Sequence, residues 1–70
     1  MRKRFEEIFR QYPDLSIEPI HPVKIGGVQF GPGARFGRGV LLSGFDLTKY
    51  TGREFEVDEE GAVWKLKGVY

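Results

Sequence analysis

The residues with the most evident binding chemistry lie in a basic, glycine-rich stretch in the middle of the chain. Arg35 and Arg38 flank Phe36 there, and Lys49 and Arg53 follow further along. Cationic side chains neutralise phosphates, while an aromatic ring offers a surface on which bases stack. These five residues therefore predict a weak site for single-stranded nucleic acid.

The charge balance does not favour nucleic-acid binding as the leading interpretation. The sequence pI is about 8.1, whereas domains that live on nucleic acid tend to have a pI above about 9. An acidic run over 54–60 also follows the basic stretch directly. We therefore favour a structural role, with Phe36 in the core and both arginines in solvent, and keep nucleic acid as the alternative partner.

Catalytic and metal chemistry has few candidate residues. His21 is the only histidine, the only serines are Ser16 and Ser43, and there is no cysteine. A nucleophile and its base are recognised by geometry, and nothing in the sequence brings these side chains together. The carboxylates of 58–60 lack the spacing of a calcium loop. We therefore expect no enzyme activity, no catalytic residues, no metal site and no cofactor.

The glycines of the central segment suggest a phosphate-binding loop, with Gly31, Gly33 and Gly37 closely spaced. Such loops open directly onto a helix, whose N-terminal amides face the anion. Here Val-Leu-Leu follows, which predicts a strand. We therefore interpret these glycines as turn and bulge residues.

The same segment carries a six-residue spacing of large apolar residues, at Phe30, Phe36 and Leu42. This spacing resembles the hexapeptide repeat of left-handed β-helix acyltransferases and related trimers. The resemblance covers only 30–42, and one coil of that fold needs three repeat units, with several coils stacked. We therefore expect an ordinary pair of glycine-kinked strands here.

The N-terminal residues show a helical spacing of apolar side chains. The stripe consists of Phe5, Ile8, Phe9 and Tyr12. Their i, i+3, i+4, i+7 spacing predicts a helix over 1–12, which Pro13 ends. Because so short a helix is marginal in water, we expect its stripe to dock on the rest of the domain.

The remainder divides into a proline-containing connector over 13–22 and a β body over 23–70. The alternation of apolar residues changes parity at Gly26-Gly27, which predicts a β-bulge and a bend. A hairpin is expected at the C-terminus with a loop over 58–61, placing Phe55 opposite Trp64.

These elements predict a single α+β domain over 1–70. A short N-terminal helix packs on a small, strongly bent antiparallel sheet, or on a partly open barrel of three to five strands.

Small size, aromatic richness and the lack of catalytic groups predict a non-catalytic interaction module that binds a protein partner or itself. Six Phe, three Tyr and one Trp suggest more apolar surface than one small core covers, so a homodimer is the simplest outcome. The expected self-association edge is the face of the last strand formed by Val63, Lys65, Lys67 and Val69. Since no apolar run is long enough for a membrane span, we expect no membrane partner and a cytoplasmic location.

Overall fold

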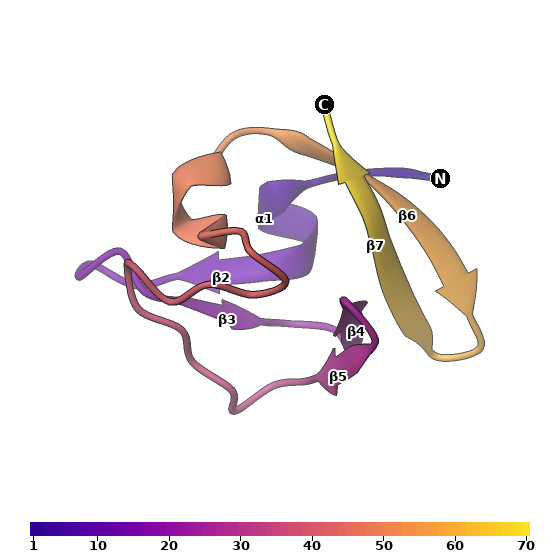
Figure 1. The fold of residues 1–70 in the computed structure, drawn as a ribbon, viewed down its shortest axis with the longest axis horizontal. Helices are drawn as coiled ribbons and strands as arrows, with labels where there is room; N and C mark the ends of the chain where they lie inside the picture. Colours follow the sequence, from indigo (N-terminus) through magenta and orange to yellow (C-terminus); the bar gives the residue numbers. More distant parts are fainter.

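Seven short strands dominate the structure, a computed structural model that describes residues 1–70 (Figure 1). In chain order the elements are β1 (Arg2–Arg4), α1 (Phe5–Ile8), β2 (Phe9–Gln11), β3 (Ile17–Pro19), β4 (Val23–Ile25), β5 (Val28–Phe30), the 3-10 turn η1 (Leu47–Tyr50), β6 (Glu54–Glu60) and β7 (Val63–Val69). Strand accounts for 46% of the chain and helical turns for 11%. The protein is therefore mostly β, and the expected α+β class is wrong.

The main sheet has five strands in the order β1-β6-β7-β4-β5. Three of its pairs are antiparallel, but β4 runs parallel to β7. The long connection from β5 to β6 makes this parallel pair possible, because it lets the chain cross back over the sheet so that β7 runs beside β4 in the same direction. The sheet is thus mixed, and the expected purely antiparallel sheet or barrel is wrong.

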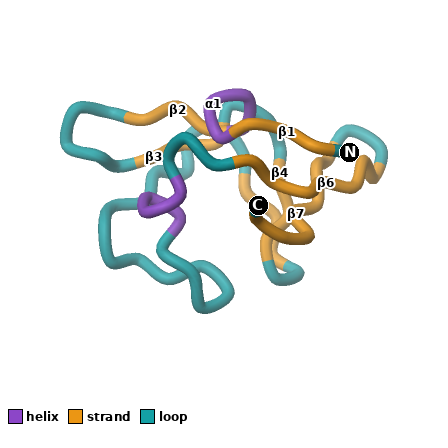
Figure 2. The backbone as a smooth tube through the Cα atoms, turned by 90° about the horizontal axis from the view of Figure 1, so that it is seen from above, coloured by secondary structure: helices purple, strands orange, loops and turns teal.

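A second, two-stranded sheet is formed by β2 and β3. Figure 2 shows these strands side by side, projecting away from the main sheet. The predicted connector over 13–22 thus contains a strand, β3, which includes Pro19. Proline is tolerated there because β3 has only one strand partner.

The predicted helix over 1–12 is also wrong. Only the four residues of α1 are helical, and Phe9 is already extended, with φ −126° and ψ 147°. The flanking residues instead form β1, paired with β6, and β2, paired with β3. Pairing with distant strands outweighs the local preference, since an isolated helix of this length is marginal.

The apolar residues of the predicted stripe are nevertheless buried. Phe5, Ile8 and Phe9 belong to the core, each 3% exposed or less, together with Phe55 from β6. The Phe9 ring centre lies 5.2 Å from Phe5 and 6.4 Å from Phe55. A cluster of three rings therefore joins the N-terminal segment to the main sheet.

Two glycine turns replace the predicted bulge and loop. Gly26 and Gly27 have φ of 59° and 84°, and they form a tight turn between β4 and β5. Such a turn needs positive φ at both positions, which glycine supplies without strain. The C-terminal hairpin is present, but Glu60 pairs with Val63, so its loop has two residues and the predicted register is wrong.

The central segment between β5 and η1 is irregular. Phe36 makes an isolated bridge to Ile17, and Leu42 makes one to Phe45. The Phe30 and Phe36 rings meet edge to face at 5.0 Å. The expected pair of glycine-kinked strands is therefore absent, and so is a β-helix coil.

Neither of the two helical turns, α1 and η1, has the length and apolar character needed to cross a membrane.

Replacing Phe9 by alanine tests the aromatic cluster. Because Phe9 is 2% exposed, we expect Phe9→Ala to lower the free energy of unfolding by about 3–5 kcal/mol, a large part of the stability of a small domain. Urea unfolding followed by circular dichroism measures this loss. Ile20→Ala is the control, since Ile20 is 45% exposed. Equal stability of the two variants would contradict the account of the core.

Candidate functional site

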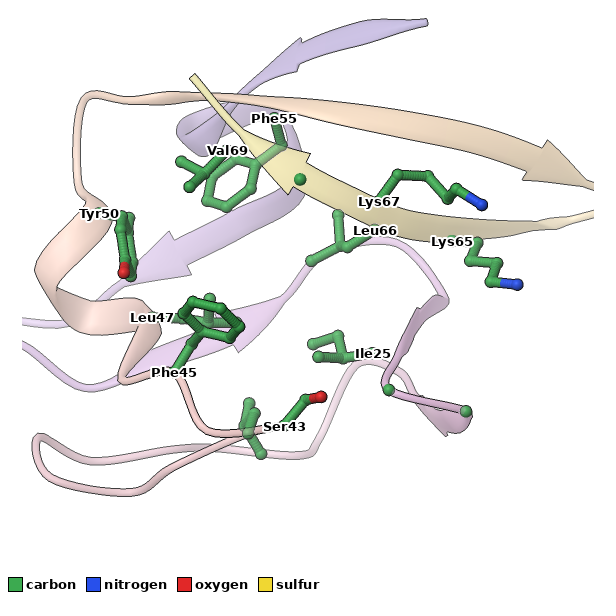
Figure 3. A pocket seen from close by; sticks show the side chains of 14 residues that line it. Ile25, Ser43, Phe45, Leu47, Tyr50, Phe55, Lys65, Leu66, Lys67 and Val69 are labelled. Atoms are coloured by element: carbon green, nitrogen blue, oxygen red, sulfur yellow. The ribbon is translucent and has the colours of Figure 1, made fainter.

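An apolar cavity of about 340 Å³ lies beside the second half of β7 (Figure 3). Fourteen residues line it, eight of them hydrophobic. They come from β4 (Ile25), the β4–β5 turn (Gly26, Gly27), the segment before and within η1 (Leu42, Ser43, Phe45, Leu47, Tyr50), β6 (Phe55) and β7 (Lys65, Leu66, Lys67, Gly68, Val69). The volume is within the range of ligand-binding cavities, about 300–1,000 Å³.

The cavity exists because β4 is shorter than the strand it pairs with. β4 matches β7 only at Trp64 and Lys65, and it ends at Ile25, whereas β7 continues to Val69. The remaining residues, Leu66–Val69, have no strand partner on this side and are called the free half of β7. A strand edge without a partner presents backbone donors and acceptors to another chain.

The wall opposite the free half of β7 is a tight turn followed by η1. Leu42 and Phe45 exchange backbone hydrogen bonds of 2.8 and 3.0 Å across Ser43 and Gly44. The φ angles of Ser43 and Gly44 are 53° and 84°. Positive φ at both positions is typical of a two-residue hairpin turn of type I′, and a serine held there stores backbone strain.

Asp46 fixes the start of η1. Its carboxylate accepts hydrogen bonds from the Thr48 hydroxyl at 2.6 Å, the Thr48 amide at 3.1 Å and the Gly39 amide at 2.9 Å. These bonds, the Thr48 hydroxyl foremost, lower the pKa of Asp46. The ionised aspartate therefore caps the turn that carries Leu47 and Tyr50 into the cavity wall.

Two tight turns meet at the cavity. A side-chain carbon added at Gly26 would lie 2.6 Å from the Ser43 Oγ and 2.7 Å from its Cβ, whereas one added at Gly27 would meet nothing within 4 Å. The Ser43 turn therefore rests directly on the backbone of the Gly26 turn. This contact holds the far wall at a fixed distance from β4.

Exposed apolar side chains continue the cavity onto the surface. Phe45 is 52% exposed and Val69 is 37% exposed. Figure 3 shows the side chains of Phe45, Leu47 and Leu66 gathered around a common space. Apolar residues lining a concave surface and also reaching solvent are typical of an interaction site.

The charged residues that line the cavity are both lysines, Lys65 and Lys67. The Lys65 ammonium lies 3.9 Å from Glu60, and the Lys67 ammonium lies 3.7 Å from Asp58. Both distances exceed those of charge-assisted hydrogen bonds, about 2.7–2.9 Å.

Arg35, predicted to contact nucleic acid, is held in a local network. Its guanidinium lies 3.8 Å from the centre of the Tyr12 ring, and it donates to the Ser16 hydroxyl at 2.7 Å and to Asp14 at 3.2 Å. Hydrogen bonds from Ser16 and the neighbouring Arg35 lower the pKa of Asp14 to about 2. Arg35 thus braces the turn between β2 and β3.

The other predicted nucleic-acid residues lie elsewhere. Phe36 is half-buried against the core, while Arg38 and Lys49 are exposed. Arg53 donates to the Tyr70 carbonyl and lies 5.8 Å from the Tyr50 ring centre. None of the residues that contact the Arg35 side chain therefore also contacts that of Arg53.

The residues considered for catalysis are also separated. His21 stacks on Trp64 with ring centres 3.8 Å apart. Ser16 donates to Asp14 at 2.6 Å, and Ser43 lies in its turn against Gly26. No group of three His, Cys, Asp or Glu side chains is arranged to hold a metal ion.

The predicted self-association edge lies on an interior strand. β7, with Val63, Lys65, Lys67 and Val69, is placed between β6 and β4, and the outer strands of the sheet are β1 and β5. Only Lys67 and Val69 of the four belong to the free half of β7.

Sequence reasoning missed the far wall of the cavity, formed by Leu42, Phe45 and Tyr50. One signal was present, because Ser-Gly between two apolar residues marks a tight turn.

No protein-family model, curated protein or solved structure matches the chain.

Substitution of the two neighbouring glycines tests the contact between the turns. Both Gly26→Ala and Gly27→Ala place alanine at positive φ, which costs roughly 1–2 kcal/mol. Gly26→Ala also clashes with Ser43, so we expect it to lose about 1–3 kcal/mol more in urea unfolding.

The double variant Gly26→Ala, Ser43→Gly removes the clashing atoms and should recover most of this extra loss. Equal stability of the two single variants, or no recovery in the double variant, would show that the two turns do not touch.

Proposed function

We propose that this chain is a non-catalytic protein-interaction module that binds an extended segment of a partner along the free half of β7. The observation that carries the proposal is the apolar cavity of about 340 Å³ directly beside a strand half that lacks a partner. Strand addition uses both features, since backbone hydrogen bonds give affinity and a pocket for alternate side chains gives specificity.

The dimensions suit a short segment. The free half of β7 has four residues, which span roughly 13 Å at about 3.3 Å per residue. An added strand of that length presents one or two side chains to the sheet face that carries Leu66. One large apolar side chain of the partner then enters the space between Leu66, Leu47 and Phe45.

Replacing Phe45 tests this site, with the capped peptide Gln-Gln-Val-Phe-Val-Gln-Gln as the probe. Because Phe45 is about half exposed, its loss should leave the fold intact while removing one wall of the cavity. We expect Phe45→Ala to weaken peptide binding at least about tenfold in fluorescence anisotropy.

Leu41→Ala is the matched control, since Leu41 is 65% exposed and does not line the cavity. It should bind like the parent protein. No binding of the peptide by the parent at millimolar concentration, or equal weakening in both variants, would refute the proposed site.

Self-association is a second candidate, and the sheet edge at β5 favours it. The other edge, β1, is made of Arg2, Lys3 and Arg4, whose like charges oppose the pairing of two copies. β5 carries no charge, and its Val28 is 54% exposed. Two copies paired through β5 would extend the sheet across a twofold axis.

Sedimentation at tens of micromolar protein tests this second candidate. Pairing through β5 predicts a species of twice the chain mass of 8.0 kDa. Val28→Lys places a charge on the edge and should restore the single-chain mass. A parent protein that sediments only as an 8.0 kDa species would exclude the homodimer.

A further inference from the structure

We infer that the extended segment bound by the free half of β7 carries acidic side chains on both sides of its apolar anchor. This inference rests on the proposed function and adds the chemistry of the partner. Of the residues lining the cavity, the charged ones are Lys65 and Lys67, and none is a carboxylate. The site thus combines an apolar floor with a cationic rim.

The two lysines retain donors for a ligand. Their ammonium groups lie 3.9 and 3.7 Å from Glu60 and Asp58, beyond hydrogen-bond distance. Their side chains are 39% and 46% exposed. Figure 3 shows both side chains extending from β7 away from the aromatic side chains. They are therefore placed to meet residues that flank an anchor, not the anchor itself.

A third cation lies at the C-terminal end of the free half of β7. The Arg53 side chain donates to the carbonyl of Tyr70, which directly follows β7, and lies 5.8 Å from the ring centre of Tyr50. One nitrogen is engaged in that bond, which leaves the terminal guanidinium donors for a carboxylate. Cations thus stand next to both ends of the free half of β7, at Lys65 and Arg53, and within it at Lys67.

The nearest acidic residue in the opposite wall does not offset these cations at short range. All the hydrogen bonds that Asp46 accepts come from Thr48 and Gly39, so its carboxylate is committed to holding η1. Along β7, a basic partner segment would therefore meet the like charge of Lys65 and Lys67, and an acidic segment meets their complementary charge. Glu60 and Asp58, which lie 3.9 and 3.7 Å from the two ammonium groups, offset part of that charge.

Three capped peptides with the same Val-Phe-Val centre test the inference: one flanked by two glutamates on each side, one by glutamines and one by lysines. An exposed ion pair contributes a factor of about 1.5 to 5 in affinity. With two or three pairs formed, we expect the glutamate peptide to bind roughly 2- to 100-fold more tightly than the glutamine peptide, and the lysine peptide to bind most weakly. The differences should shrink as salt is raised to 1 M, because exposed charges are then screened.

Charge removal identifies the residues responsible. The double variant Lys65→Gln, Lys67→Gln should lose most of the preference for the glutamate peptide over the glutamine peptide. Lys24→Gln is the matched control, since Lys24 is 38% exposed and 4.0 Å from the same Glu60 but does not line the cavity. It should keep the full preference.

The possible outcomes separate this inference from the proposed function. Equal binding of the three peptides at the free half of β7, or tightest binding of the lysine peptide, would overturn the inference and leave the proposed function standing. Absence of binding by all three would overturn both. A single-stranded DNA decamer of mixed sequence is the fourth probe. If the parent protein binds it more tightly than the glutamate peptide, and the double-lysine variant loses this binding, the cationic rim is assigned to nucleic acid. That result would overturn the inference.

Discussion

The mismatch in length between β4 and β7 is the constraint on which the candidate site depends. β7 has seven residues and β4 has three, and the chain reverses at Gly26 and Gly27 into β5 as soon as β4 ends. Had β4 continued, it would have occupied the position beside Leu66–Val69. Because β4 stops, one half of an interior strand of the sheet stays unpaired on one side, next to the hydrophobic core.

The rest of the molecule keeps this opening from collapsing. The three-ring cluster of Phe5, Phe9 and Phe55 anchors the N-terminal segment to β6, so β7 is supported from its other side. On the far wall, Asp46 fixes η1 and Ser43 rests on the Gly26 turn. The cavity is bordered by elements that are tied to one another, a preorganisation that lowers the ordering cost of binding.

Sequence reasoning succeeded where a feature is local and failed where it depends on distant pairing. The burial of Phe9 followed from its apolar neighbours, although the secondary structure assigned to it was wrong, because strands contributed from other parts of the chain replaced the helix. The C-terminal hairpin was found, but its two-residue loop at Gly61 shifted the register. The cavity could not be predicted, since it requires the parallel pairing of 23–24 with 64–65. No local periodicity shows which distant strands become neighbours.

The central claim is that a partner segment adds to the sheet along the free half of β7, and amide hydrogen exchange with and without the saturating glutamate-flanked peptide tests it most directly. Strand addition places new hydrogen bonds on backbone groups, so exchange should slow within Leu66–Val69 and in the Ser43 turn opposite. Amides of 35–38 and of β5 should exchange at unchanged rates. Protection confined to 35–38 or to β5, with no change within Leu66–Val69, would contradict the account.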